Sequence, residues 1–119
     1  QVNPPLPFTP GGETAGRVVA LGDGVEGLQV GQRVVAMGGG LAEQAVVSAN
    51  MVFAVPESLS QAKAAAVPLN YGTTWFALHD RARLVEGETL LVTGASGGTG
   101  SAAIQLGLAA GARVIAIAA

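Results

Sequence analysis

The sequence predicts an α/β fold in which an all-β unit is followed by a strand–loop–helix–strand unit. Three observations support this. Short β-type segments separated by glycine turns fill the first half of the chain. After Ser58 the apolar residues recur at helical spacing. Residues 89–118 then read as an apolar strand, a glycine loop, a helix and a second apolar strand, which is the length of one βαβ crossover.

The bulk composition is that of a globular protein and argues against several classes of function. Half of the 119 residues are hydrophobic, 12% are charged and the formal net charge is −2, so we expect no nucleic-acid partner. There is no cysteine for a disulfide or a thiolate metal site. The apolar C-terminal stretch is interrupted by polar residues and glycines, which predicts protein interior and no membrane partner. We expect a soluble, cytoplasmic protein.

In the first half we expect four short strands of a barrel or sandwich. Glycine turns separate them, and Pro56 stops the last one. The predicted strands are Arg17–Leu21, Arg33–Met37, Glu43–Val47 and Met51–Pro56.

A helical segment is expected to follow. Ser60 is a suitable N-cap for an alanine-rich helix, which Pro68 ends or kinks. A second helix is predicted by apolar residues on one face, for which we expect the two aromatic members to lie in the core: Tyr71, Trp75, Leu78 and Ala82.

The last part of the chain is predicted to form one crossover. Thr89–Thr93 is a short apolar run typical of a strand covered on both faces. A helix is expected over roughly Gly100–Ala110, with Gly111 at the position after its end. Arg113–Ala118 is predicted to be the second strand.

The loop TGASGGTG lies between the first of these strands and the helix. Gly94, Gly97 and Gly100 give the spacing G-x-x-G-x-x-G. A diphosphate approaches backbone N–H groups at a helix N-terminus, where Cβ atoms would block it. Gly97 and Gly98 leave that approach open, and Gly100 allows close packing of the helix on the strand. The loop therefore predicts a nucleotide diphosphate site.

Two hydroxyl side chains of the same loop, Ser96 and Thr99, are candidates to bind phosphate oxygens. The alternative is a turn in which glycine serves geometry only, but the flanking strands and helix favour nucleotide binding. No Lys-Ser/Thr pair follows the glycines, which excludes a mononucleotide P-loop. The residue that distinguishes NAD from NADP is expected about 20 residues beyond the glycines, past Ala119.

The order of these parts resembles the medium-chain dehydrogenase/reductase superfamily, and within it the zeta-crystallin-like quinone oxidoreductase group. The resemblance rests on FTPGGETAGRVVALGDGVEGLQVGQRVVA, AEQAVVS, VPLNYGTTWFAL and GETLLVTGASGGTGSAAIQLGLAAGARVIA. It implies an α/β chain made of a partial GroES-like β-barrel unit over 1–57, connecting helices over 58–84, and an incomplete Rossmann dinucleotide-binding unit over 85–119.

Two motifs of the superfamily can be compared with this sequence directly. Zinc-dependent members carry G-H-E, in which the histidine binds the catalytic zinc, whereas this chain has Gly12 at that place, in GGE. The structural-zinc cysteines are also missing, so the resemblance implies a zinc-free reductase and no metal site. His79, the only histidine, is expected to be a surface or packing residue.

The segment Tyr71-Gly72-Thr73 resembles the family's Y-x-T-A motif, whose threonine lies beside the nicotinamide ring. The resemblance implies that Thr73 bonds the carboxamide or ribose of the cofactor. Thr74 departs from the usual alanine. The alternative is that Thr73 only caps or packs its helix.

The resemblance implies NADPH-dependent transfer of hydride to a quinone or an α,β-unsaturated carbonyl, with NADH as the alternative cofactor. No general acid can be named, so the catalytic residues are unknown. Members of the family are commonly dimers, which implies a homodimer. The sequence looks cut at both ends, and we expect the 119 residues alone to be weakly active or inactive.

Two other interpretations stay open at this point. One is a non-catalytic truncated domain that binds a nucleotide or has a structural role. The other is a short-chain dehydrogenase, because the loop also satisfies T-G-x-x-x-G-x-G. That family places the motif near the N-terminus and has a Tyr-x-x-x-Lys, whereas here Trp75 stands four residues after Tyr71, which disfavours it.

Overall fold

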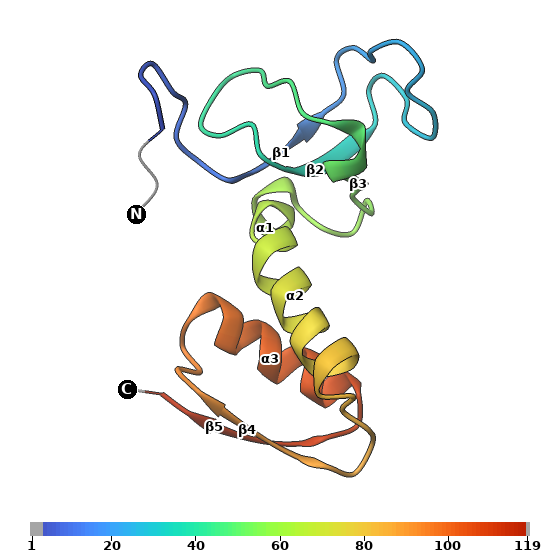
Figure 1. Cartoon of the computed structure of the whole chain (residues 1–119). Helices are drawn as coiled ribbons and strands as arrows, with labels where there is room; N and C mark the ends of the chain where they lie inside the picture. Colours follow the sequence, from blue (N-terminus) through green and yellow to red (C-terminus); the bar gives the residue numbers. More distant parts are fainter. Residues whose placement is uncertain (1–3, 119) are drawn as a thin grey trace. The chain divides into compact units, whose positions relative to one another are not determined.

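The computed structural model describes residues 4–118. The chain forms two compact units, Gln1–Ala65 and Ala66–Ala119 (Figure 1). The first unit contains an antiparallel sheet with a short helix, and the second contains a parallel strand pair with two helical segments. The predicted α/β class is confirmed. The three-part division at residues 57 and 84 stays a prediction.

The sheet of the first unit has three strands in the order β1 (Glu13–Arg17), β2 (Arg33–Met37) and β3 (Val52–Ala54). Both pairs are antiparallel, with Ala15 opposite Val35 and Val35 opposite Phe53. A 3-10 turn, η1 (Ala49–Met51), precedes β3, and the helix α1 (Gln61–Ala65) follows it. The small core of this unit consists of Val35, Val55 and Ala64, against which Ala15 and Leu59 pack.

The predicted strands Arg33–Met37 and Met51–Pro56 are confirmed in position, and two others are wrong. The strand expected at Arg17–Leu21 lies four residues earlier, as β1. Two further backbone bonds extend the pairing, from the N–H of Val18 to the carbonyl of Gln32 at 3.0 Å and from the N–H of Gly31 to the carbonyl of Val18 at 2.7 Å. Gly31 then turns the partner chain away with φ 86°. Val19 is therefore left 67% exposed in spite of its β-branched side chain.

No strand forms at Glu43–Val47, where the chain is irregular. Three glycines with positive φ, Gly38 to Gly40, precede this segment. A Cβ added to Gly39 would lie 2.8 Å from the Cβ of Ala45, so the segment is held against the sheet edge by close packing. A short β-type segment after the glycines predicted a strand here, but the glycine turn determines the local path of the chain.

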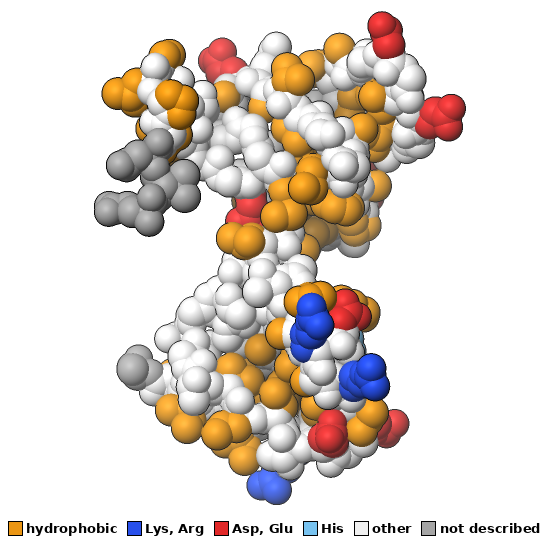
Figure 2. All heavy atoms as spheres, viewed as in Figure 1, with side chains coloured by type: hydrophobic (Ala, Val, Ile, Leu, Met, Phe, Trp, Pro, Cys, Tyr) orange, Lys and Arg blue, Asp and Glu red, His pale blue; other side chains and the backbone are white. Residues whose placement is uncertain are grey.

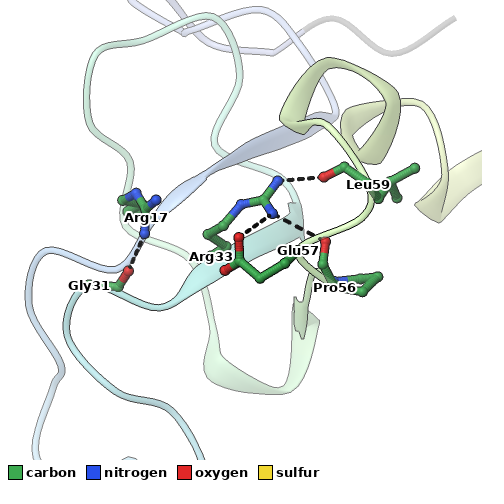
Figure 3. A network of polar contacts seen from close by, with 6 residues as sticks. All are labelled: Arg17, Gly31, Arg33, Pro56, Glu57 and Leu59. Carbon is green, nitrogen blue, oxygen red and sulfur yellow. Dashed lines mark hydrogen bonds and ion pairs between the residues drawn. The ribbon is translucent and has the colours of Figure 1, made fainter.

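Arg33, the first residue of β2, ties the sheet to the segment that leads into α1 (Figure 3). Its guanidinium donates hydrogen bonds to the carbonyl oxygen of Leu59 and, at 3.2 Å, to that of Pro56. It also forms an ion pair with Glu57, whose nearest oxygen lies at 3.2 Å. The Arg33 side chain is 10% exposed and that of Glu57 is 89% exposed, so the carbonyl bonds are the better protected part of the network.

The second unit begins with α2 (Pro68–Trp75), which continues without a break into a π-helical turn, η2 (Phe76–Arg81). It is followed by β4 (Thr89–Thr93), α3 (Gly98–Ala109) and β5 (Arg113–Ile117). The two strands are parallel and pair residue by residue, from Thr89 opposite Arg113 to Thr93 opposite Ile117. This strand–helix–strand order confirms the predicted crossover.

The prediction that Pro68 ends the alanine-rich helix is confirmed, because α1 ends at Ala65 and a separate helix starts at Pro68. Pro68 is the first residue of α2, where its missing N–H needs no partner and its fixed φ suits a helix. The predicted apolar face is wrong in part, since Trp75 is 54% exposed and Ala82 is exposed, whereas Leu78 is buried. Thr74 occupies the inward position instead, with 2% exposure.

The helix α3 covers one face of the strand pair. A Cβ added to Gly107 would lie 2.7 Å from Leu90 and 3.1 Å from Val114, so the helix backbone packs tightly on both strands. The expectation that the first strand is covered on both faces is not met among the described residues. Exposed hydrophobic side chains are visible on this unit (Figure 2). Those on the two strands are Leu91, Ile115 and Ile117.

Over residues 4–118 no helix has the length and apolar character needed to cross a membrane.

The Arg33 network gives the first testable prediction. We expect Arg33→Ala to lower the free energy of unfolding of the first unit by about 2 kcal/mol, because two carbonyl groups, of which that of Leu59 is partly buried, lose a charged donor. Glu57→Ala, the control, should change it by less than about 0.5 kcal/mol, because the exposed carboxylate is screened by water. Urea titrations followed by circular dichroism measure both. Equal effects of the two substitutions would contradict the dominance of the carbonyl bonds.

Candidate functional site

The glycine loop lies at the carboxyl ends of β4 and β5, where open parallel sheets place their ligands. Gly94 leaves the first strand with φ 64°, a conformation that suits glycine. The N–H of Ala95 donates to the carbonyl of Ile117 at 3.0 Å, which fixes the loop to the end of β5. The N–H of Gly97 donates to the carbonyl of Gly94, also at 3.0 Å. The loop is therefore a closed turn held by both strands.

Gly100 is required by the path of this turn. A Cβ at residue 100 would lie 2.3 Å from the carbonyl oxygen of Gly94 and 2.8 Å from the Cα of Ala95. The glycine thus lets the first turn of α3 approach the loop backbone. Close packing of the helix on the strand itself is provided one and a half to two turns later by Gly107. The motif gave no reason to single out Gly107, and its only signal was a glycine inside a helix, which is costly unless packing needs it.

The N-terminus of α3 presents free donors. The first helical bond runs from the N–H of Ser101 to the carbonyl of Gly97, at 2.8 Å. The N–H groups of Gly98, Thr99 and Gly100 therefore have no acceptor within the helix. Gly97 is the N-cap and supplies no side-chain cap. Together these groups offer an anion several backbone N–H donors at the positive end of a helix dipole.

Six of the seven residues predicted from the sequence line one open cleft of about 470 Å³. Thr73 reaches it from α2, and the loop contributes Gly94, Gly97, Gly98, Thr99 and Gly100. Ser96 is exposed in the same loop but is not part of the cleft lining. The structure thus brings together the threonine and the glycine loop, which are about 20 residues apart in the sequence.

Gly98 occupies a tighter position than the sequence indicated. A Cβ at this residue would lie 2.6 Å from the side-chain oxygen of Asn70. At Gly97, in contrast, an added Cβ would meet only the carbonyl of Gly94, at 3.3 Å. Of the two glycines expected to leave room for a phosphate, Gly98 also leaves room for a side chain of α2.

Thr74 is the residue of this region that the sequence did not assign to a site. Its hydroxyl is 2.7 Å from the carbonyl oxygen of Asn70 and 3.3 Å from that of Thr99. It lines the cleft and is the one buried polar side chain among the described residues. Its departure from the alanine usual in the family was the available signal.

The cleft has no ionisable side chain among its lining residues, which are apolar, glycine or threonine. Backbone N–H groups and hydroxyls are its polar groups. Such a lining can bind and orient an anionic ligand, and it offers no acid or base for proton transfer.

A metal centre finds no support in the described part of the chain. Within residues 4–118 no three His, Cys, Asp or Glu residues lie close enough to hold an ion. Gly12, which the resemblance puts at the place of the zinc-binding histidine, has nothing within 4 Å of an added Cβ. His79 packs against Trp75, with ring centroids 4.0 Å apart and planes tilted by 40°.

Comparison with known proteins places this chain in a family. Residues 1–57 match the family model of the alcohol dehydrogenase GroES-like domain. The chain is 42% identical over 108 residues to quinone oxidoreductase-like protein 2 of Mus musculus, covering 89% of this chain and 31% of that protein. It is 41% identical over 115 residues to the quinone oxidoreductase of Rattus norvegicus, covering 94% and 35%.

Solved structures agree with these relatives. A probable oxidoreductase from Mycobacterium abscessus superposes with a TM-score of 0.92 and 43% identity, covering 99% of this chain and 38% of that one. The chain belongs to the medium-chain dehydrogenase/reductase superfamily. A mycobacterial member of known structure in complex with NADPH superposes with a TM-score of 0.85 and 33% identity, covering 95% and 36%.

These findings confirm the resemblance to the quinone oxidoreductase group of the medium-chain dehydrogenase/reductase superfamily. They also confirm the fold class, a partial GroES-like unit followed by the start of a Rossmann domain. The chain spans about a third of the length of these relatives. The short-chain dehydrogenase interpretation is therefore set aside.

Alanine substitutions at two helical glycines of this unit should change the free energy of unfolding in opposite directions. Gly100→Ala is expected to lower the free energy of unfolding by about 1–3 kcal/mol, because the new Cβ overlaps the loop backbone. Gly72→Ala, on an open face of α2, should raise it by about 0.5–1 kcal/mol through helix propensity. Thermal unfolding followed by the fluorescence of Trp75, the only tryptophan, measures both. A neutral Gly100→Ala would contradict the close approach.

Proposed function

We propose that the cleft of the second unit binds the diphosphate and the nicotinamide end of NADPH, with NADH as the alternative. We propose further that it serves a zinc-independent reductase that transfers hydride to a quinone or an α,β-unsaturated carbonyl. The observation that carries the proposal is that Thr73 and the glycine loop line the same cleft. The oxidoreductase family itself is given by the relatives.

The relatives support the finer parts of this proposal. The rat relative is named a quinone oxidoreductase. The solved JamJ enoyl reductase superposes with a TM-score of 0.80 and 37% identity, covering 92% of this chain and 33% of that one. An enoyl group is an unsaturated bond conjugated to a carbonyl, which is the same acceptor chemistry as in a quinone. The NADPH complex of the mycobacterial relative supports the choice of cofactor.

The residues present fit a dinucleotide. The free N–H groups of residues 98–100 form a donor cluster for phosphate oxygens, and Gly97 leaves them accessible. The hydroxyl of Thr99, in the cleft lining, and that of Ser96, in the same loop, are further candidate donors. Thr73, which lines the cleft from α2, is proposed to bond the carboxamide or ribose. When bound, the reduced nicotinamide supplies the hydride.

The protein's own task in this proposal is orientation and exclusion of water. The lining gives no general acid, so a proton for the reduced product must come from elsewhere. Leu78, Val92 and Ala103 form apolar walls that restrict water on one side of the cleft.

A non-catalytic nucleotide-binding role is the second candidate. It is favoured by the absence of ionisable side chains from the cleft lining.

Gly97→Val tests the diphosphate site. A branched side chain at the N-cap would stand in front of the donor cluster, so we expect the Kd for NADPH to rise at least about tenfold. Energy transfer from Trp75 to the bound dihydronicotinamide reports binding, because Trp75 lies two residues after Thr73. Gly72→Ala serves as the control with unchanged affinity. An unchanged Kd in Gly97→Val rules out the proposed diphosphate role.

Turnover by this chain tests the non-catalytic candidate. We expect the 119-residue chain to bind NADPH and to oxidise it slowly or not at all with a quinone acceptor, because no proton donor lines its cleft. The loss of NADPH absorbance with and without the quinone measures this. Fast turnover by this chain would refute the expectation and exclude the non-catalytic candidate.

A further inference from the structure

We propose that Thr74 is a positioning residue for the cofactor cleft. Its hydroxyl fixes α2, which carries Thr73, against the first turn of α3, which follows the diphosphate loop. This inference rests on the proposed function, because it assumes that one ligand uses both ends of the cleft.

The hydrogen bonds of Thr74 differ from those of an ordinary helical threonine. A threonine inside a helix commonly donates to the carbonyl four residues earlier, and Thr74 does so to Asn70 at 2.7 Å. What is particular here is the second carbonyl, that of Thr99, which belongs to another helix and lies at 3.3 Å. One hydroxyl hydrogen is therefore shared between two helices at a site with 2% exposure.

A second contact lies one helical turn away on α2. The side-chain oxygen of Asn70 would be 2.6 Å from a Cβ at Gly98, so the amide rests directly on the backbone at the start of α3. The amide nitrogen of Asn70 donates to the carbonyl of Ala66 at 3.3 Å, which holds the side chain along α2. Two contacts at successive turns restrict both the distance and the rotation between the helices.

These contacts lie at the point where the two parts of the cleft meet. Thr73 is the neighbour of Thr74 in α2, and Thr99 follows the glycines whose N–H groups face the ligand. A small shift of α2 along α3 changes the spacing between Thr73 and the loop. The loop itself is held independently by Gly94 and by the bond from Ala95 to Ile117.

Two consequences follow for ligands of different length. A ligand that contacts both Thr73 and the loop depends on the spacing set by Thr74. A ligand that contacts the loop alone does not depend on it. The role is thus positioning and differs from general stabilisation of the fold, which would weaken both ligands.

The experiment compares NADPH with 2′-phospho-ADP-ribose, which has the same diphosphate half and lacks the nicotinamide ring. Binding of each to the wild-type chain, Thr74→Val and Thr74→Ser is measured by isothermal titration calorimetry. Valine keeps the shape of threonine without the hydroxyl, and serine keeps the hydroxyl. Thr74→Ala is the second variant without a hydroxyl, and it replaces valine in the comparison if Thr74→Val does not fold in thermal unfolding.

We expect Thr74→Val to raise the Kd for NADPH about fivefold, which is the equivalent of one net hydrogen bond. The Kd for 2′-phospho-ADP-ribose should stay within about twofold of the wild-type value. Thr74→Ser should bind NADPH as the wild type does. Unchanged NADPH binding in Thr74→Val, an equal loss for both ligands, or no rescue by serine would each overturn the positioning role. If the wild type binds neither ligand, or if Gly97→Val binds both normally, the proposed function fails first.

Discussion

The close approach of α3 to the backbone of the glycine loop is the constraint on which the second unit depends. At Gly100 the distance from a hypothetical Cβ to the carbonyl oxygen of Gly94 is 2.3 Å, so the residue type is determined by sterics. Because α3 starts this close to the end of β4, its free N–H groups open onto the carboxyl edge of the strand pair. The same approach brings the helix onto Leu90 and Val114 at Gly107. The site and the packing of the unit therefore both depend on glycines, Gly100 and Gly107, at positions where a Cβ would clash.

The cleft needs a second wall, and α2 provides it through small and polar residues. An apolar interface between α2 and α3 would bury more hydrophobic surface, but it would leave their rotation less defined. Thr74 and Asn70 instead meet carbonyl and backbone atoms at Gly98 and Thr99. Directional contacts of this kind restrict the rotation of α2 and with it the distance between Thr73 and the loop. These contacts stabilise the unit only modestly, and their main effect is to restrict how the two helices are oriented.

The parts of this structure that sequence could predict are those with local causes. The strand, loop, helix and strand over residues 89–117 follow from an apolar run, glycine spacing and a C-terminal glycine, Gly111, all of which act within one crossover. The position of β1 could not be predicted in this way, because Gly31 on the partner strand ends the pairing beyond Val18. The exposure of Trp75 was missed for a similar reason. Its helix presents Thr74 to α3, and that choice depends on the tertiary contact with Thr99.

The polar groups of the cleft also limit the chemistry that the chain can perform by itself. Backbone N–H groups and threonine hydroxyls keep the same charge across the physiological pH range. They bind an anion through fixed dipoles at a helix end, and they neither accept nor release protons during a reaction. A site of this composition leaves the difficult bond-breaking step to a bound cofactor and contributes distance and orientation instead. This cleft has such a composition, since its lining consists of glycines, threonines and apolar residues with no charged side chain.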